Sequence, residues 1–188
     1  LSPSLIRDNE PAYDLCDRTV DNLIGQGYQE ACNYSLRSSD ELRSWFPEIN
    51  LEDLALGNPL TADHTHIRAS LLPGLVQVLA HNQKNLNDLN HLFEIGRVFQ
   101  PGPRGNAELI SIAWVNTQAN SRKNWKEEES SDFFSLKNSL ERLLHAVGLN
   151  LPKGLWQSTE DQLPWQSGYA ATLGDVHRNK LGIGLGTL

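Results

Sequence analysis

Two apolar stretches separated by a short Pro/Gly-rich segment most constrain how this chain can fold. His91–Phe99 alternates between apolar and other side chains, and Leu109–Val115 is rich in β-branched residues. Both patterns are typical of strands that bury at least one face. The segment 101–106 between them holds two prolines and two glycines and predicts a turn. We therefore expect a sheet, with antiparallel pairing favoured.

Three amphipathic segments predict helices that cover this sheet. Pro11–Gln26 carries apolar residues near helical spacing and ends among glycines, which are common stop signals. Ser70–Lys84 has a proline in its first turn, and Asp132–Val147 begins with a plausible N-cap. Tyr28–Leu36 and short segments within 156–188 are expected to add strands. The mixture predicts an α+β fold of helices and a mainly antiparallel sheet.

The charge balance argues against one broad class of function. The 188 residues include 16 Lys and Arg against 23 Asp and Glu, which gives a formal net charge of −7. The basic residues are scattered along the sequence, whereas a nucleic-acid-binding domain normally gathers them on one face. Direct nucleic-acid binding by this chain is therefore disfavoured.

Cysteine usage and hydropathy indicate the cellular compartment of the protein. Cys16 and Cys32 are expected to be small, buried apolar side chains, and two lone thiols indicate a reducing compartment. No apolar run approaches the ~18 residues of a membrane span, and no signal-peptide pattern opens the chain. We expect a cytoplasmic protein without a membrane partner.

The ends of the sequence indicate a piece of a longer protein. The chain opens with Leu1, ends with Leu188 inside an expected strand, and contains no methionine. We expect residues 1–10 to be a linker from a preceding domain and residues 11–188 to form one module.

Two segments resemble a metal site or a phosphate-binding loop, but each also has an ordinary structural interpretation. Asp63–His66 contains His-x-His, but no third ligand has suitable spacing, so a solvated loop is favoured over a metal site. Gly182–Gly186 superficially resembles a phosphate-binding loop. That motif must open a helix after a strand, so a glycine-bearing strand is favoured here. We assign neither segment a metal or catalytic role.

Three further motifs are much more specific. They read Asn58-Pro59-Leu60-Thr61, Arg68-Ala69-Ser70-Leu71-Leu72-Pro73-Gly74-Leu75 and Leu92-Phe93-Glu94-Ile95-Gly96-Arg97-Val98-Phe99. Their order and spacing resemble the core signature of the β subunits of bacterial phenylalanyl-tRNA synthetases. Shorter pieces at Asn124-Trp125 and Asp132–Lys137 resemble further landmarks of that family, so the resemblance covers roughly residues 10–188.

This resemblance implies the class II synthetase fold, an antiparallel sheet flanked by helices. In the family, such a module pairs with the catalytic module of an α subunit in an (αβ)₂ heterotetramer. The α subunit holds phenylalanine, ATP and Mg²⁺, and the whole complex binds tRNA(Phe). The resemblance therefore implies a catalytically inert core module that scaffolds the α subunit and binds no cofactor itself.

One position supports this expected loss of chemistry. Active class II synthetases carry an F-R-x-E motif after a strand like Leu92–Phe99, and its Arg binds the α-phosphate of ATP. Here Gln100 and Pro101 follow that strand. Gln offers neither the cation nor the rigid donor fork of Arg, and losing one transition-state donor costs about 3–4 kcal/mol. We mark Gln100 as a degenerate ATP-site position and expect no catalytic residue.

The other motif residues have two open interpretations. They support the fold locally, with a buried Arg68 tying down a carboxylate or carbonyl, or they contribute to the interface with the α subunit. The alternative function, a free-standing class II-like ATP-dependent adenylating enzyme, predicts ATP binding by this chain alone. The candidate interface or structural residues are Asn58, Pro59, Leu60, Arg68, Ser70, Leu71, Leu72, Pro73, Gly74, Phe93, Glu94, Gly96 and Arg97, with Glu94 and Arg97 as candidate polar anchors.

Overall fold

The computed structural model describes residues 11–85, 89–102, 105–117 and 133–149 in full, together with the backbone of three short strands near the C-terminus. The expected linker over residues 1–10 and the expected N-cap Asp132 lie outside the described residues. None of the helices within these ranges is long and apolar enough to cross a membrane. In chain order the elements are α1 (Pro11–Gly25), β1 (Gln29–Glu30), β2 (Leu36–Arg37), α2 (Ser39–Trp45), the 3₁₀ helix η1 (Leu51–Leu54), β3 (His66–Ile67), α3 (Leu72–Lys84), β4 (His91–Gln100), β5 (Ala107–Asn116), α4 (Phe133–Ala146), β6 (Trp156–Ser158), β7 (Ala170–Leu173) and β8 (Ile183–Gly186).

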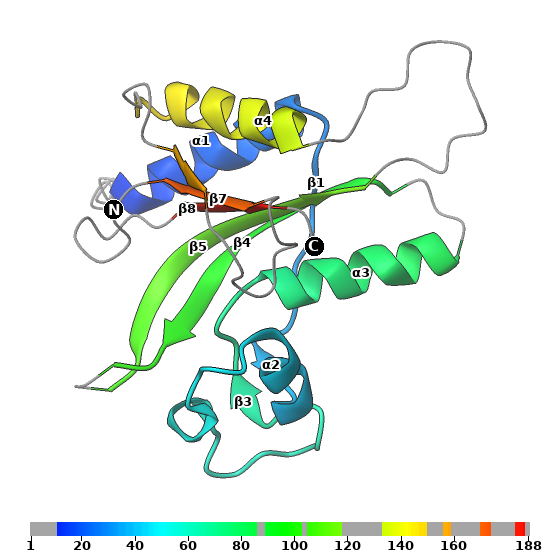
Figure 1. Cartoon of the computed structure of the whole chain (residues 1–188), viewed down its shortest axis with the longest axis vertical. Helices are drawn as coiled ribbons and strands as arrows, with labels where there is room; N and C mark the ends of the chain where they lie inside the picture. The colour runs from blue at the N-terminus through cyan, green and yellow to red at the C-terminus, as the bar shows by residue number, and fades with distance from the viewer. Residues whose placement is uncertain are drawn as a thin grey trace, which may run out of the picture.

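The long antiparallel pair β4–β5 forms the centre of the fold (Figure 1). Its register runs from His91 opposite Asn116 to Gln100 opposite Ala107. β1 joins the other edge of β4, in parallel, so the strand order is β1-β4-β5. The expected antiparallel pairing is confirmed for β4–β5 and for the separate sheet β6-β7-β8, but it is wrong for β1. A parallel pair needs a long crossover, which the chain between β1 and β4 supplies.

Helices cover both faces of the central sheet (Figure 1). α1 and α4 lie side by side over one face, and α3 packs against the opposite face. Leu92 and Phe93, neighbours in β4, enter different cores because successive side chains of a strand point to opposite faces. The core under α1 and α4 contains Leu23, Tyr28, Phe93 and Leu143, whereas the core under α3 contains Leu75, Leu79, Leu92 and Val115.

A glycine turn connects α1 to the sheet. Gly27 has φ +91°, a left-handed conformation that favours glycine. This turn lets the Tyr28 N–H donate to the Leu23 carbonyl at 3.0 Å. Leu23 and Tyr28 then pack in the same core, as in a Schellman helix end. The turn therefore fixes where β1 enters the sheet.

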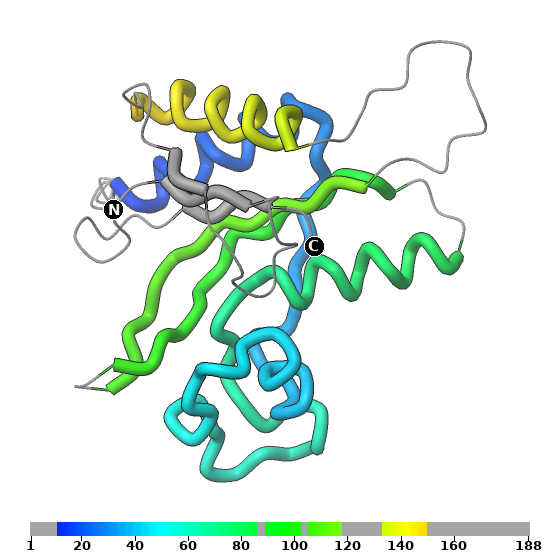
Figure 2. The backbone as a smooth tube through the Cα atoms, viewed as in Figure 1, coloured from blue at the N-terminus to red at the C-terminus, as the bar shows by residue number. Residues whose placement is uncertain are grey.

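Residues 36–67 form a smaller unit, which we call the distal lobe. It contains α2, η1 and the antiparallel pair β2–β3, and it lies beyond the start of α3, away from α1 and α4 (Figure 2). The Ser38 side chain accepts a hydrogen bond from the Glu41 N–H and caps α2. Leu42 and Leu54 are buried inside the lobe, each 1% exposed.

The strand expected over Tyr28–Leu36 is present only at its two ends. The Ala31 N–H still donates to the Phe93 carbonyl at 2.7 Å. The backbone N–H of Asn33, two residues further along the chain, donates instead to the side chain of Glu94. A side chain thus replaces the neighbouring strand as partner, and the backbone leaves the sheet before it pairs again as β2.

The expectation of two buried cysteines is wrong for Cys32. This residue lies in the stretch that leaves the sheet, and it is exposed. Cys16, in α1, is half-buried. Both thiols are free.

Candidate functional site

A buried ion pair joins β4 to the segment before α3. Nη1 of Arg68 lies 2.5 Å from Oε1 of Glu94, and the two side chains are only 5% and 3% exposed. The same guanidinium donates from Nε to the carbonyl of Arg97 at 2.8 Å and from Nη1 to the carbonyl of Asn33 at 3.4 Å. One side chain therefore holds three separate segments of the chain together.

The Glu94 carboxylate has further donors besides Arg68. The backbone N–H of Asn33 donates to Oε1 at 3.3 Å, and its side-chain amide donates to Oε2 at 2.7 Å. A buried carboxylate without such partners would cost several kcal/mol in desolvation. The cation and the two amides therefore allow Glu94 to stay inside the protein.

Two glycines make room for two arginines. A Cβ on Gly96 would overlap the guanidinium of Arg68 and would come within 3.4 Å of Leu71 Cδ2. A Cβ on Gly74 would overlap the guanidinium of Arg37. Both positions therefore permit a close approach that a larger residue would prevent.

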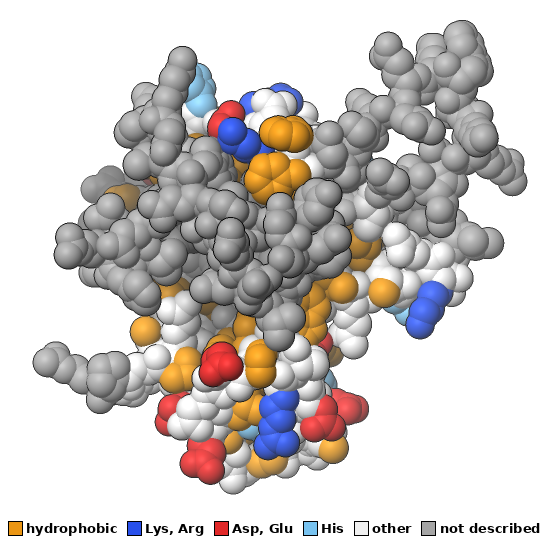
Figure 3. All heavy atoms as spheres, in the orientation of Figure 1, with side chains coloured by type: hydrophobic (Ala, Val, Ile, Leu, Met, Phe, Trp, Pro, Cys, Tyr) orange, Lys and Arg blue, Asp and Glu red, His pale blue; other side chains and the backbone are white. Residues whose placement is uncertain are grey.

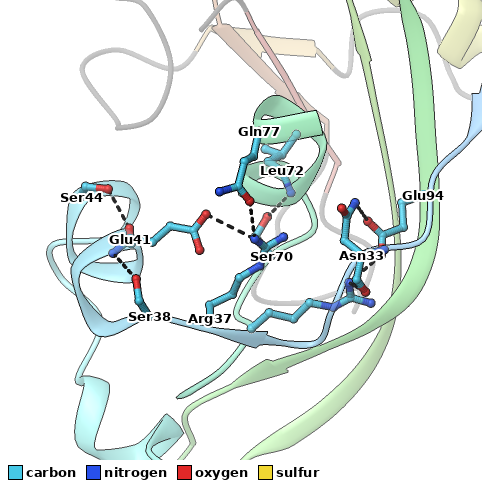
Figure 4. Close-up of polar contacts among 10 residues, drawn as sticks. Asn33, Arg37, Ser38, Glu41, Ser44, Ser70, Leu72, Gln77 and Glu94 are labelled. Carbon is cyan, nitrogen blue, oxygen red and sulfur yellow. Dashed lines mark hydrogen bonds and ion pairs between the residues drawn. The ribbon is translucent and has the colours of Figure 1, made fainter. Parts of the chain in front are cut away.

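Arg37 forms a second set of contacts beside the first (Figure 4). Its Nη1 donates to Gln77 Oε1 at 3.0 Å and lies 3.5 Å from Glu41 Oε1, and its side chain is 10% exposed. The carbonyl of Arg37 accepts from the Thr65 N–H at 3.0 Å. This residue therefore connects α2, α3 and the end of the distal lobe. We call Asn33, Arg37, Arg68 and Glu94 the buried polar cluster, in which Asn33 is half-buried and the other three are buried.

The geometry of this cluster suits anchoring better than catalysis. Arg68 and Glu94 neutralise each other and are removed from solvent, whereas a general acid or base must reach its substrate. Among the described ranges, no three His, Cys, Asp or Glu side chains group so that they could hold a metal ion. His66 Nδ1 instead lies 2.7 Å from Thr65 Oγ1, and the ring of His64 packs against Tyr34.

The described part of the glycine-rich segment, Ile183–Gly186, also has a structural role. Ile183–Gly186 is strand β8 and pairs antiparallel with β7. The interpretation of this segment as a glycine-bearing strand is confirmed.

The sequence matches a known family over nearly its whole length. The family model described as "Phenylalanyl tRNA synthetase beta chain CLM domain" matches residues 3–183. The chain belongs to this family. The phenylalanine–tRNA ligase β subunit of Vibrio cholerae serotype O1 is 34% identical over 131 residues, which are 68% of this chain and 16% of that protein. The β subunit of Aliivibrio fischeri is 32% identical over 150 residues, 78% of this chain and 19% of that protein. This CLM chain thus spans less than a fifth of these relatives.

Solved structures place the CLM chain in the class II synthetase fold. Pyrrolysyl-tRNA synthetase from Desulfitobacterium hafniense superposes with a TM-score of 0.62 over 96% of this chain and 60% of that chain, at 14% identity. An ATP phosphoribosyltransferase regulatory subunit/histidyl-tRNA synthetase from Bacillus halodurans C superposes with a TM-score of 0.55 over 77% of this chain and 37% of that chain, also at 14% identity. The expected α+β, class II synthetase-like architecture is confirmed, with the mixed central sheet described above.

The end of β4 holds Gln100, the position predicted from the sequence to be a degenerate ATP site. Gln100 is the last residue of the strand, pairs with Ala107 and is exposed. Arg97, three residues earlier, is also exposed and forms an ion pair with Glu108 across the hairpin. The hydrogen bond and negative charge of Glu108 raise the pKa of Arg97 above its ordinary value. Arg97 is therefore anchored at the surface, unlike Glu94.

The structure brings only some of the predicted site residues together. The Ser70 hydroxyl accepts from the Leu72 N–H at 3.2 Å and so starts α3, whose first turn contains Pro73 and Gly74. Phe93 belongs to the core on the other face of the sheet. The predicted residues that meet around the buried polar cluster are Arg68, Leu71, Gly74, Glu94, Gly96 and the backbone carbonyl of Arg97. The side chain of Arg97 and the residues Asn58, Pro59, Leu60, Phe93 and Gln100 lie elsewhere.

Sequence reasoning missed half of the buried polar cluster. Asn33 lies 61 residues from Glu94, and Arg37 lies 40 residues from Gln77. Neither belongs to the recognised motifs, and both fall in or next to the expected strand Tyr28–Leu36. A polar Asn within that expected strand and a charged Arg directly after it were the available signal.

Proposed function

We propose that this chain is the non-catalytic core module of a phenylalanine–tRNA ligase β subunit. In this proposal it scaffolds, in the cytoplasm, an α subunit that ligates phenylalanine to tRNA(Phe) within an (αβ)₂ heterotetramer. ATP and Mg²⁺ belong to the α subunit, and the module binds no cofactor of its own. Membership of the β-chain CLM family supports this role.

The observation that carries the proposal is Gln100 at the end of β4. An active class II enzyme needs a cation at this position to stabilise the charge that develops on the α-phosphate of ATP. A neutral amide supplies no such charge. Removing one preorganised donor slows chemistry by about 10²–10³-fold, so the substitution supports a module without adenylating activity.

Phenylalanine-dependent exchange of pyrophosphate into ATP tests the proposal, because the exchange requires adenylate formation. We expect the chain alone to give the background rate, and the variant Gln100→Ala to give the same rate. Exchange above background that Gln100→Ala abolishes would identify a free-standing adenylating enzyme and would overturn the proposal.

A further inference from the structure

The distal lobe carries a loop, residues 57–64, with a fixed base and an open tip. At the base, the Leu56 N–H donates to the Thr65 carbonyl at 2.9 Å, and Ala55 forms a β-bridge with His66. Every residue from 57 to 63 is exposed. Leu60, near the tip, is 96% exposed. The loop therefore presents a leucine to solvent from a defined position.

A second exposed apolar side chain lies at the end of this loop. Tyr34 is 78% exposed, and its ring centroid lies 5.4 Å from that of His64. Single exposed apolar residues are ordinary on protein surfaces. Here Leu60 lies near the tip of the loop, Tyr34 contacts His64 at the end of the loop, and Pro59 beside Leu60 is exposed as well. We call Tyr34, Pro59, Leu60 and His64 the loop patch.

The distal lobe, which carries the loop patch, has a net negative charge. Residues 34–66 contain six Asp or Glu against two Arg, a net charge of −4 out of the −7 of the whole chain. Arg37 and Glu41 pair with each other inside the lobe. Figure 3 shows acidic side chains gathered over the lobe with few basic ones among them. The remaining charges are Asp40, Glu48, Glu52, Asp53 and Asp63 against Arg43.

This negative charge favours one class of binding partner for the loop patch over others. An acidic surface repels RNA and repels a second copy of itself, whereas it attracts a basic protein surface. We infer that loop 57–64 docks, through Leu60, into an apolar pocket rimmed by Lys or Arg on a protein partner. The inference rests on the proposed function, under which this partner is the α subunit.

The buried polar cluster prepares the loop for such docking. The carbonyl of Arg37 accepts from the Thr65 N–H, and the Thr65 hydroxyl also lies 3.5 Å from that carbonyl. Arg37 is in turn held by Gln77 of α3. A loop that is ordered before binding loses less conformational entropy when it binds. The anchoring contacts thus support the exposed tip from inside the protein.

Calorimetric titration of the chain with purified α subunit tests this inference. Leu60→Ala removes the apolar contact and is expected to weaken binding by about tenfold or more. Leu60→Glu and Leu60→Lys both place a charge at the tip, and a basic rim predicts that Lys binds several-fold more weakly than Glu. Phe134→Ala, which truncates a 72% exposed side chain on α4, is the matched control and should bind like the wild type.

The outcomes separate the two proposals. If the wild type binds no α subunit, the proposed function fails. If the wild type binds and all three Leu60 variants bind equally well, only the docking inference fails. The docking inference would also be overturned if the chain bound a tRNA(Phe) transcript and the Leu60 variants weakened that binding while their affinity for the α subunit stayed unchanged. Leu60 is almost fully exposed, so we expect the thermal unfolding midpoint of each variant to match the wild type.

Discussion

The guanidinium of Arg68 and the carboxylate of Glu94 meet at 2.5 Å although they are 26 residues apart in the sequence. Arg68 stands at the junction of the distal lobe and α3, and Glu94 stands in the middle of β4. The pair therefore fastens the lobe to the central sheet. Because both side chains are buried, either one becomes an uncompensated charge when its partner is removed.

The first prediction concerns this pair directly. Glu94→Gln keeps the shape of the side chain but leaves the Arg68 cation without a counter-charge. We expect a loss of about 3–5 kcal/mol in the free energy of unfolding, measured by urea denaturation. Arg97→Gln, which breaks the exposed pair with Glu108, is the control and should have a much smaller effect. Equal losses for the two variants would contradict the assigned difference in burial.

A second prediction concerns the coupling between the two charges. The double variant Arg68→Met, Glu94→Gln removes both charges, so neither is left buried alone. We expect it to lose clearly less stability than the sum of the two single variants, because buried charges are costly mainly when unpaired. Strictly additive losses in the double-mutant cycle would show that the two side chains do not interact.

A third prediction concerns the space above β4. Gly96→Ala adds a methyl group where the Arg68 guanidinium lies, so the guanidinium must shift away from Glu94. We expect a loss of about 1–3 kcal/mol. Gly57→Ala is the matched control, because a Cβ there meets nothing within 4 Å. Its effect should stay within about 0.5 kcal/mol, and a tolerated Gly96→Ala would contradict the close approach.

A fourth prediction uses two adjacent positions of α1. Leu23 is fully buried under α4, whereas Ile24 is 53% exposed. We expect Leu23→Ala to destabilise the protein by about 2–5 kcal/mol through the cavity it leaves. Ile24→Ala should cost less than about 1 kcal/mol. Thermal and urea unfolding of the two variants measure this contrast, and a reversed order would mean that α1 faces the sheet differently.

A fifth prediction concerns the thiols. Cys32 is exposed and Cys16 is half-buried, so Cys32 should react first with a thiol-specific chromogenic reagent. The variant Cys32→Ser should lose the fast phase and keep the slow one. A fast phase that survives in this variant would place Cys32 inside the protein.

Elements with a strong local pattern were predictable from the sequence. The alternation in His91–Phe99 predicted a strand, and β4 covers His91–Gln100. The helix expected over Ser70–Lys84 is α3, which starts two residues later because the Ser70 hydroxyl accepts from the first helical N–H. In both cases the periodicity of neighbouring side chains determines the element, and no distant partner is required.

Features that depend on distant partners were not predictable in this way. The break in the strand Tyr28–Leu36 arises because Asn33 bonds to Glu94, 61 residues away. The parallel pairing of β1 depends on a crossover that contains the whole distal lobe. Arg68 and Glu94 were both recognised from motifs, but their contact with each other appears only in three dimensions. The family-like motifs thus identified half of the cluster, and the fold supplied the other half.

The central claim is that this module binds its partner subunit and performs no chemistry of its own. Isothermal titration calorimetry of the chain, first with ATP–Mg²⁺ and phenylalanine and then with purified α subunit, tests it most directly. We predict no saturable heat with the small molecules and saturable binding of the α subunit. Saturable ATP binding that a change at Gln100 weakens, together with no binding of the α subunit, would contradict the claim.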